Sequence, residues 1–340
     1  MTSPSPGQRG RGRGRGRRGE QPMVPDAEFT SYYGRPVLKA APWGEDIPAY
    51  LFLGGLAGGS ALLGAGADLT RRPRLRRSAR FGALGAITLS LAALVHDLGR
   101  PERFLNMLRT AKPTSPMSVG TWILNAFTPA VALAAAAEFG ASIPEPLGGL
   151  IRSSGRPAGL AAAALGPAVA SYTAVLIADT ATPAWHEGFR ELPFVFVGSA
   201  SAASGGWGML TAPLREVGPA RRMAVGGAAV ELLAESVMER RMGLAAEALH
   251  HGRAGTLVRA AKALPAAGAA APARSGRSPS ATRLAGVALL VSSALTRFGV
   301  FEAGQDSARD PKYTVVPQAE RAAARAAAAA EGLPPDSPLG

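Results

Sequence analysis

Side chains that can handle protons lie at the ends of apolar blocks in this sequence, and one lies inside a block. His96 and Asp97 end one such block, and Tyr172 precedes Asp179 by about two helical turns in another. A carboxylate at the boundary of a membrane span can exchange protons with water. A phenol inside a bilayer needs a hydrogen-bond partner. These residue types predict proton chemistry at the membrane surface.

Two glutamates stand inside a later apolar block. Glu231 and Glu235 are four residues apart and therefore share one helical face. A carboxylate at mid-bilayer costs about 2.5 to 3.5 kcal/mol, so the pair must face protein or water. The pair forms either a proton path or a structural pair with Arg222, Arg297 or another cation, and the structural interpretation is slightly favoured. We expect Glu302 to form a similar interfacial pair with Arg297.

The chain lacks the residues that usually hold redox metals. It has no cysteine, which excludes disulfides, a thiolate nucleophile, covalently attached haem and a cysteine-held iron–sulfur cluster. It has four histidines, whereas a bundle holding two b-type haems needs four axial ligands that face one another. His250 and His251 lie beside Arg253 in a polar stretch, and we expect them to be solvated. We predict no metal site, so any redox centre must come from elsewhere.

The arrangement of apolar residues indicates a membrane protein. Charged residues make up only 18% of the chain, yet the formal charge is +13, because arginines crowd between apolar blocks about twenty residues long. We predict an all-α fold, a polytopic membrane helical bundle of about eight transmembrane helices in two four-helix bundles. The predicted spans cover residues 46–67, 79–97, 119–139, 157–178, 192–211, 220–237, 255–273 and 283–300. The seventh is interrupted by charges and prolines, so seven spans is the alternative.

The domain organisation follows from these blocks. Residues 1–45 form a disordered Arg/Gly-rich tail, which has no interleaved aromatic residue and therefore does not indicate nucleic-acid binding. Residues 46–304 form the transmembrane domain, with a first bundle at 46–179 and a second at 190–304, and residues 305–340 form a polar C-terminal tail. Trp122 and Trp185 are expected to anchor span ends at the level of the lipid head groups.

Several motifs resemble those of one membrane-protein family. They are YLFLGGLAGGS at residues 50–60, HDLGRPERF at 96–104, PTSPMSVGTW at 113–122, SYTAVLIADTATPAW at 171–185 and TRFGVFEAG at 296–304. Together they resemble the NrfD/polysulfide reductase membrane-subunit family over residues 40–315. Between residues 212 and 283 the likeness rests mainly on hydropathy.

The resemblance implies a function in electron transport. Members of this family are quinone-reactive anchors of molybdopterin oxidoreductases in the inner (plasma) membrane, and they hold no haem or cluster of their own. The implied partners are a ferredoxin-like subunit with four iron–sulfur clusters and a molybdopterin catalytic subunit, for example of the formate dehydrogenase or polysulfide reductase type. Richness in Ala, Gly, Pro and Arg is typical of a GC-rich bacterium, for which menaquinone is the expected quinone.

The resemblance also assigns site residues. Tyr172 matches the family's quinone-contacting tyrosine, and Tyr50 falls where the polysulfide-reductase type has a histidine. Asp97 belongs to the DLGRP motif and is assigned to proton handling, with His96 beside it. Residues 100–122 are expected to contribute to the partner surface.

Simpler interpretations of the same residues stay open. Asp97 and Arg100 could form an ion pair at a helix end, His96 could be an ordinary boundary histidine, and Tyr172 could be a packing residue bonded to a neighbouring helix. The alternative functions are a transporter or proton-translocating subunit that uses Glu231 and Glu235, and a purely structural anchor.

Overall fold

The computed structural model describes residues 35–100, 102–275 and 278–330, and this part of the chain is helical with no strand. The predicted all-α fold class is therefore confirmed. Five helical segments are long and apolar enough to cross a membrane: α1 (Asp46–Leu69), α2 (Pro73–Asp97), α4 (Pro116–Ala136) with its extension to Ser142, α5 (Leu147–Ala178) and α10 (Pro279–Arg309). The chain therefore folds as a polytopic membrane helical bundle.

Three further long helices pack beside these five. They are α7 (Leu192–Thr211), α8 (Gly218–Arg241) and α9 (Gly252–Ser275), at the positions of the fifth, sixth and seventh predicted spans. By length and composition they do not join the five spanning candidates, so the total of eight stays a prediction. The helix α9 continues through Pro265, one of the prolines that interrupt the seventh predicted span. The shorter helices are α3 (Arg103–Leu108), α6 (Pro183–Glu187) and α11 (Lys312–Ala330).

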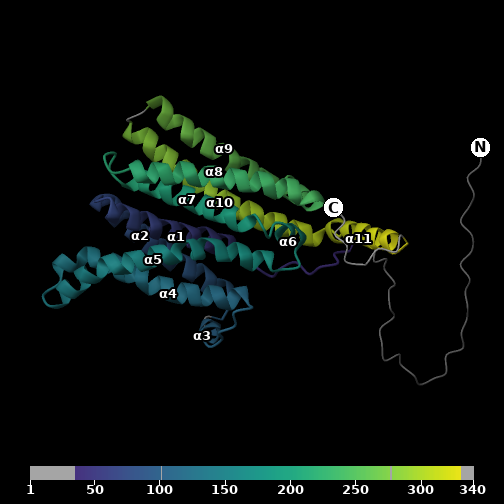
Figure 1. Ribbon diagram of the computed structural model, residues 1–340, viewed down its shortest axis with the longest axis horizontal. Coiled ribbons are helices and arrows are strands. Elements are labelled where there is room, and N and C mark those ends of the chain that lie inside the picture. Colours follow the sequence, from purple (N-terminus) through teal and green to yellow (C-terminus); the bar gives the residue numbers. More distant parts are fainter. Residues whose placement is uncertain (1–34, 101, 276–277, 331–340) are drawn as a thin grey trace, which may run out of the picture. The chain divides into compact units, whose positions relative to one another are not determined.

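The long helices form two groups that meet at α1 (Figure 1). The first helix group contains α1, α2, α4 and α5, and the second contains α7, α8, α9 and α10. Small residues let α1 pack closely against α5 in its own group and against α7 in the other. A Cβ atom added to Gly58 would lie 2.4 Å from the carbonyl oxygen of Gly166 on α5, and one added to Gly59 would lie 2.8 Å from that of Ala200 on α7. Only glycine fits at these two positions.

Two helices begin earlier than hydropathy predicts. The helix α2 starts at Pro73 rather than residue 79, because proline suits the first helical turn and Glu216 accepts the next two backbone N–H groups at 2.9 and 3.0 Å. The helix α5 starts at Leu147 rather than residue 157, and Glu145 accepts the backbone N–H of Gly149 at 2.9 Å. Charged residues that hydropathy assigned to loops thus lie within the first turns of these two helices.

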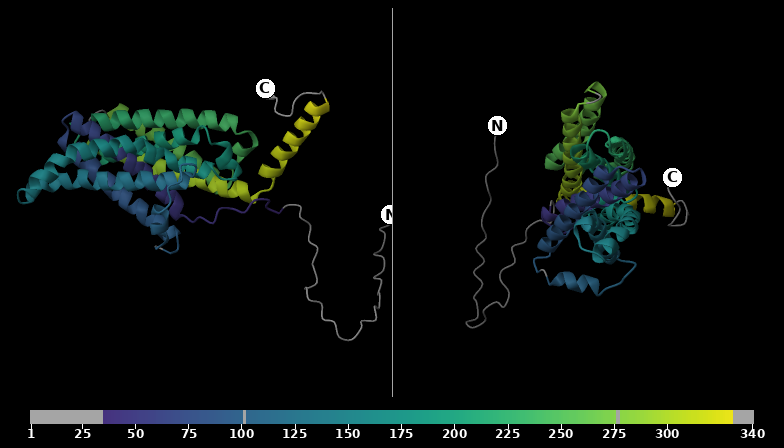
Figure 2. Two further views of the ribbon diagram at one scale, coloured as in Figure 1. Left: turned by 60° about the horizontal axis from the view of Figure 1, so that its bottom comes forward. Right: turned by 90° about the vertical axis from the view of Figure 1, so that its left-hand side faces the viewer.

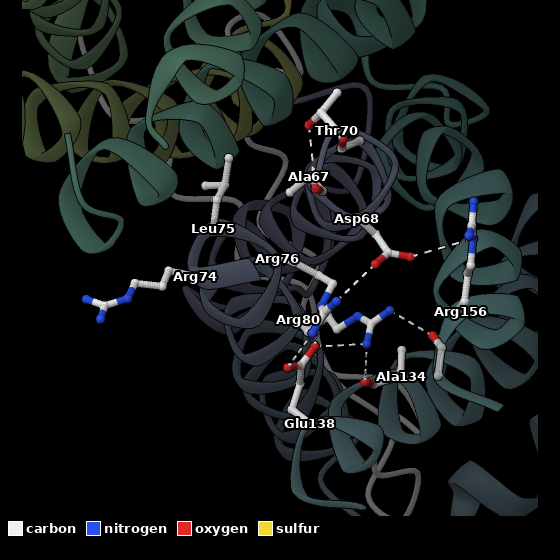
Figure 3. Close-up of polar contacts among 12 residues, drawn as sticks. Ala67, Asp68, Thr70, Arg74, Leu75, Arg76, Arg80, Ala134, Glu138 and Arg156 are labelled. Carbon is white, nitrogen blue, oxygen red and sulfur yellow. Dashed lines mark hydrogen bonds and ion pairs between the residues drawn. The ribbon is translucent and has the colours of Figure 1, made fainter. Parts of the chain in front are cut away.

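An ion-pair cluster holds the end of the first helix group at the α1–α2 connection (Figure 3). Glu138 accepts from Arg76 at 2.8 Å and from Arg80 at 2.9 Å, and Asp68 lies 3.1 Å from Arg76. Arg156 on α5 lies 3.9 Å from Asp68. Arg80 is only 8% exposed. Some of the arginines that the sequence places between apolar blocks therefore form ion pairs that join one helix to another.

The two predicted tails are only partly described. Residues 1–34 of the predicted N-terminal tail, and residues 331–340 of the C-terminal one, lie outside the described residues. Residues 35–44 form no helix, but the carbonyl of Ala41 accepts from Gln305 at 3.0 Å. Beyond residue 305, α10 continues to Arg309 and α11 follows it, leaving the bundle at an angle to α10 (Figure 2).

Trp185 is not the lipid-facing anchor that the sequence predicts. It is 1% exposed, its indole N–H donates to the carbonyl of Val300 at 2.8 Å, and its ring stacks on Trp43 at 5.8 Å. That prediction is wrong, because α6 turns the chain back onto α10 and Gly304 leaves room for the ring. Trp122 is 44% exposed and donates to the carbonyl of Thr110 at 3.1 Å.

Candidate functional site

Two tyrosines from distant parts of the chain meet inside the first helix group. Tyr50 lies in the first turns of α1 and Tyr172 near the end of α5, and their hydroxyl groups are hydrogen-bonded to each other. The two residues are 3% and 8% exposed, respectively. Each buried phenol therefore has the partner that it needs. The bond also gives Tyr172 the contact with a neighbouring helix that its packing interpretation requires.

The same two tyrosines line a cavity of about 100 Å³. Asp97, at the end of α2, is the other ionisable residue on its wall. The rest of the wall is almost wholly apolar and comes from α1, α2, α3, α4, α5 and the segment before α1: Trp43, Ile47, Leu94, Leu98, Met107, Met117, Thr121, Leu124, Leu176 and Ile177. The arrangement is a small apolar chamber with hydroxyl and carboxyl groups on its wall.

A glycine that the sequence analysis did not single out fixes the position of the Tyr172 ring. A Cβ atom at Gly120 on α4 would lie 2.3 and 2.5 Å from two carbon atoms of this ring. The ring can therefore lie across α4 only because residue 120 has no side chain. The available signal was the glycine inside the PTSPMSVGTW motif, but its meaning depends on which helix packs there.

A larger apolar space adjoins the cavity. It has a volume of about 410 Å³, and it shares Leu94, Met107, Thr121 and Leu124 with the smaller cavity. Its remaining lining comes from α2, α3 and α4: Leu91, Phe104, Leu108, Asn125, Thr128 and Pro129. The short helix α3 therefore lines both spaces, which lie side by side at α4.

Of the four predicted site residues, the structure brings Tyr50, Tyr172 and Asp97 to one cavity. The carboxylate of Asp97 accepts the backbone N–H of Gly44 at 3.3 Å, and in the described part of the chain no ion pair joins it to Arg100. His96 does not line the cavity. Its side chain is 80% exposed, and its Nδ1 atom lies 2.8 Å from the carboxylate of Asp46.

The predicted charge pairs of the second helix group are arranged differently. Glu302 lies 3.3 Å from Arg253, not beside Arg297, so that prediction is wrong. The reason is that the Arg297 side chain is fully buried and donates to the carbonyl of Phe196 at 2.7 Å. Glu235 lies 3.8 Å from Lys262, which supplies the other cation that the sequence left open. No ion pair with Arg222 occurs among the described residues.

Among the described residues, no group of three or more His, Cys, Asp or Glu side chains could hold a metal ion. His250 is half-exposed and lies 3.6 Å from Glu239, and the Nδ1 atom of His251 lies 2.8 Å from the carbonyl oxygen of Glu247. Asp179 lies exposed at the end of α5 and does not line the cavity.

Comparison with known proteins bears on this arrangement. The family model described as "Polysulphide reductase, NrfD" matches residues 37–235, which include α1 to α7 and most of α8. The chain belongs to the NrfD family. No curated protein matches it. NrfD proteins are multi-pass membrane subunits of molybdopterin oxidoreductases. They interact with quinone, and they work with iron–sulfur and molybdopterin subunits. The matched residues include the tyrosine pair and the residues that line both cavities.

Proposed function

We propose that this NrfD protein exchanges electrons between a docked four-cluster iron–sulfur subunit and the menaquinone of the inner (plasma) membrane. The quinone head group binds in the cavity beside Tyr50, Tyr172 and Asp97. The observation that carries this proposal is the meeting of two buried phenols, 122 residues apart in the chain, on the wall of an apolar chamber that also holds a carboxylate.

The residues present fit a quinone. When bound, this carrier supplies the chemistry of two electrons and two protons. The chain supplies a chamber for a flat ring and, next to it, an apolar path for a long hydrocarbon tail. Together the two spaces reach the range of about 300 to 1,000 Å³ that is usual for ligand pockets. The apolar lining around a few polar groups also matches such sites.

The polar groups have separable tasks. The Tyr50 and Tyr172 hydroxyls can each donate to a ring oxygen once their mutual bond opens. Asp97 lies at the end of α2, where it can take up a proton and pass it on, and the Gly44 N–H holds its carboxylate in place. The His96–Asp46 pair lies at the exposed side of the same helix ends and can exchange protons with water.

The partner surface follows from what surrounds the cavity. Residues 102–114 are mostly exposed, and they carry Arg103, Arg109 and Lys112, while Leu105 is 58% exposed. Phe104 and Met107, from the same short helix, line the tail path. An acidic iron–sulfur subunit docked here would bring its nearest cluster close to the chamber. The molybdopterin subunit, of the formate dehydrogenase or polysulfide reductase type, would attach through it.

The test is a matched pair of tyrosine substitutions in the complex purified by gentle detergent extraction. Tyr172→Phe removes one hydroxyl from the cavity, whereas Tyr313→Phe removes one from a buried tyrosine outside it. A hydrogen bond in such a site contributes about 1 kcal/mol or more, so Tyr172→Phe should lower quinone turnover at least about fivefold. Tyr313→Phe should leave turnover unchanged.

Three results would contradict the proposal. Turnover that is equal in the two variants and in the natural chain would place the head group elsewhere. Purified complexes without an iron–sulfur subunit would remove the electron partner and leave a structural anchor. Strong b-type haem bands that belong to this chain would mean that it carries its own redox centre.

A further inference from the structure

A second group of buried polar residues lies away from the tyrosine cavity, among α8, α9 and α10. Glu231 is 4% exposed and Glu235 is 5% exposed, and both project from α8. Thr296 on α10 donates to the Glu231 carboxylate at 2.8 Å. The neighbouring Arg297 is fully buried, with its guanidinium 3.8 Å from the centre of the Phe196 ring.

This cluster is not a closed ion pair. No carboxylate among the described residues lies within 4.0 Å of Arg297, and its Nε and Nη1 atoms have no hydrogen-bond partner. One carboxylate oxygen of Glu235 is also without a hydrogen bond. A buried charge pair stabilises a protein only when its geometry is good and its remaining polar atoms are satisfied. The pairing of Glu235 with Lys262 therefore leaves other polar atoms of the cluster without partners.

The charges explain why a proton belongs here. Three carboxylates, from Glu231, Glu235 and Glu239, face two cations, Arg297 and Lys262, so ionisation of all three glutamates would leave an excess negative charge in an apolar bundle. Such a charge is costly, and a buried group avoids the cost by holding a proton. Glu231 and Glu235, four residues apart on one helical face, can share that proton or pass it between them.

A row of titratable groups joins the cluster to the surface. Lys262 on α9 lies 3.8 Å from Glu235 and donates to Glu239, one turn further along α8. The Nε2 atom of His250 lies 3.6 Å from the other oxygen of Glu239. The exposed fraction of the side chain is 7% for Glu235, 32% for Lys262, 21% for Glu239 and 48% for His250, so the row leads from a buried residue to an exposed one.

We propose that Glu231 and Glu235 form a proton-exchanging site inside the second helix group, and that Lys262, Glu239 and His250 connect this site to water. Each step moves a proton between neighbouring groups and requires no other reactant. The charged groups that face the glutamates are Arg297 from α10, Lys262 from α9 and Glu239 from α8 itself, and α7 offers the hydroxyl of Ser199. The site lies beside α1, because a Cβ atom at Gly55 would be 3.4 Å from the Arg297 guanidinium.

Infrared spectroscopy on the full chain, with its co-purified subunits in nanodiscs, tests the proposal without using quinone turnover. Glutamate labelled with ¹³C at the side-chain carboxyl identifies bands from Glu alone. We expect a protonated carboxyl band that changes reversibly with bulk pH and shifts in D₂O. Glu235→Gln or Glu231→Gln should remove part of this band, whereas Glu145→Gln, an exposed residue of the first helix group, should not.

The connection to the surface has its own readout. Glu239→Gln should slow the exchange of the band into D₂O by at least about tenfold, because proton transfer through a positioned side chain usually contributes that much or more. A spectrum without a protonated glutamate band at any pH would overturn the proposal, as would a band that neither titrates nor exchanges. The pH titration of the band and its exchange into D₂O can both be measured on the natural chain. Exchange at the natural rate in Glu239→Gln would refute the proposed row. None of these measurements uses quinone turnover, so their failure is distinguishable from failure of the proposed quinone site.

Discussion

Substitution of Gly120 by alanine tests whether the position of the Tyr172 ring matters to the reaction. The added methyl group would lie 2.3 and 2.5 Å from two ring carbons, where ordinary contact begins at 3.4 Å. The ring must therefore move by about 1 Å, and a displacement of that size from the productive geometry can cost about 100-fold in rate. Overpacking of this kind also costs about 1 to 3 kcal/mol of stability.

The assay is turnover of a quinone analogue by the purified complex, measured together with its thermal unfolding. We expect Gly120→Ala to lose turnover by between tenfold and 100-fold, while the complex stays assembled. Gly85→Ala on α2 is the matched control, because a Cβ atom at Gly85 meets nothing within 4 Å. Natural turnover in Gly120→Ala would refute the reasoning. Equal losses in the two variants would also refute it, since the effect would then be general.

Two further predictions concern stability and pH. Gly58→Ala should lower the melting temperature of the detergent-solubilised chain, because its methyl group would lie 2.4 Å from the backbone carbonyl oxygen of Gly166, which cannot rotate away. Gly226→Ala is the control, because a Cβ atom at Gly226 meets nothing within 4 Å, and it should leave the melting temperature unchanged. Equal melting temperatures for the two variants would contradict this prediction. The Arg241 guanidinium, hydrogen-bonded to Glu191, holds the pKa of that carboxyl below its ordinary value. The contribution of the pair to the free energy of unfolding is therefore present above the pKa that Glu191 has in the unfolded chain, and it is lost as pH falls through the pKa in the folded chain. The melting temperature of Glu191→Gln should therefore lie below that of the natural chain at neutral pH and equal it in acid. A difference in melting temperature that does not change with pH would exclude the ion pair as its cause.

Hydropathy predicts the helices well where their ends coincide with the ends of apolar blocks. It places the fifth span at the observed bounds of α7, and it places the first within two residues of α1. It fails at the start of α2, because the first turn is amphipathic and is capped by Glu216, a residue far away in the chain. Hydropathy contains no information about such a distant partner.

The site was accessible from the sequence only in part. The motifs indicate Tyr50, Tyr172 and Asp97, and the structure places all three on one cavity. Neither spacing nor composition reveals that Gly120 lies under the Tyr172 ring, since that depends on which helices pack together. The same limitation explains the errors at Trp185 and Glu302, whose partners lie on helices far away in the chain.

The glycines of α1 bring the two helix groups together on one helix. They allow its backbone to lie close to backbone atoms of α5 on one side and of α7 on the other, so a larger residue at these positions would force the helices apart. Carriers that alternate between inward-open and outward-open states do so by rocking one half against the other. In this chain both helix groups pack on one shared helix, α1, so such rocking would have to break the close backbone contacts at Gly58 and Gly59.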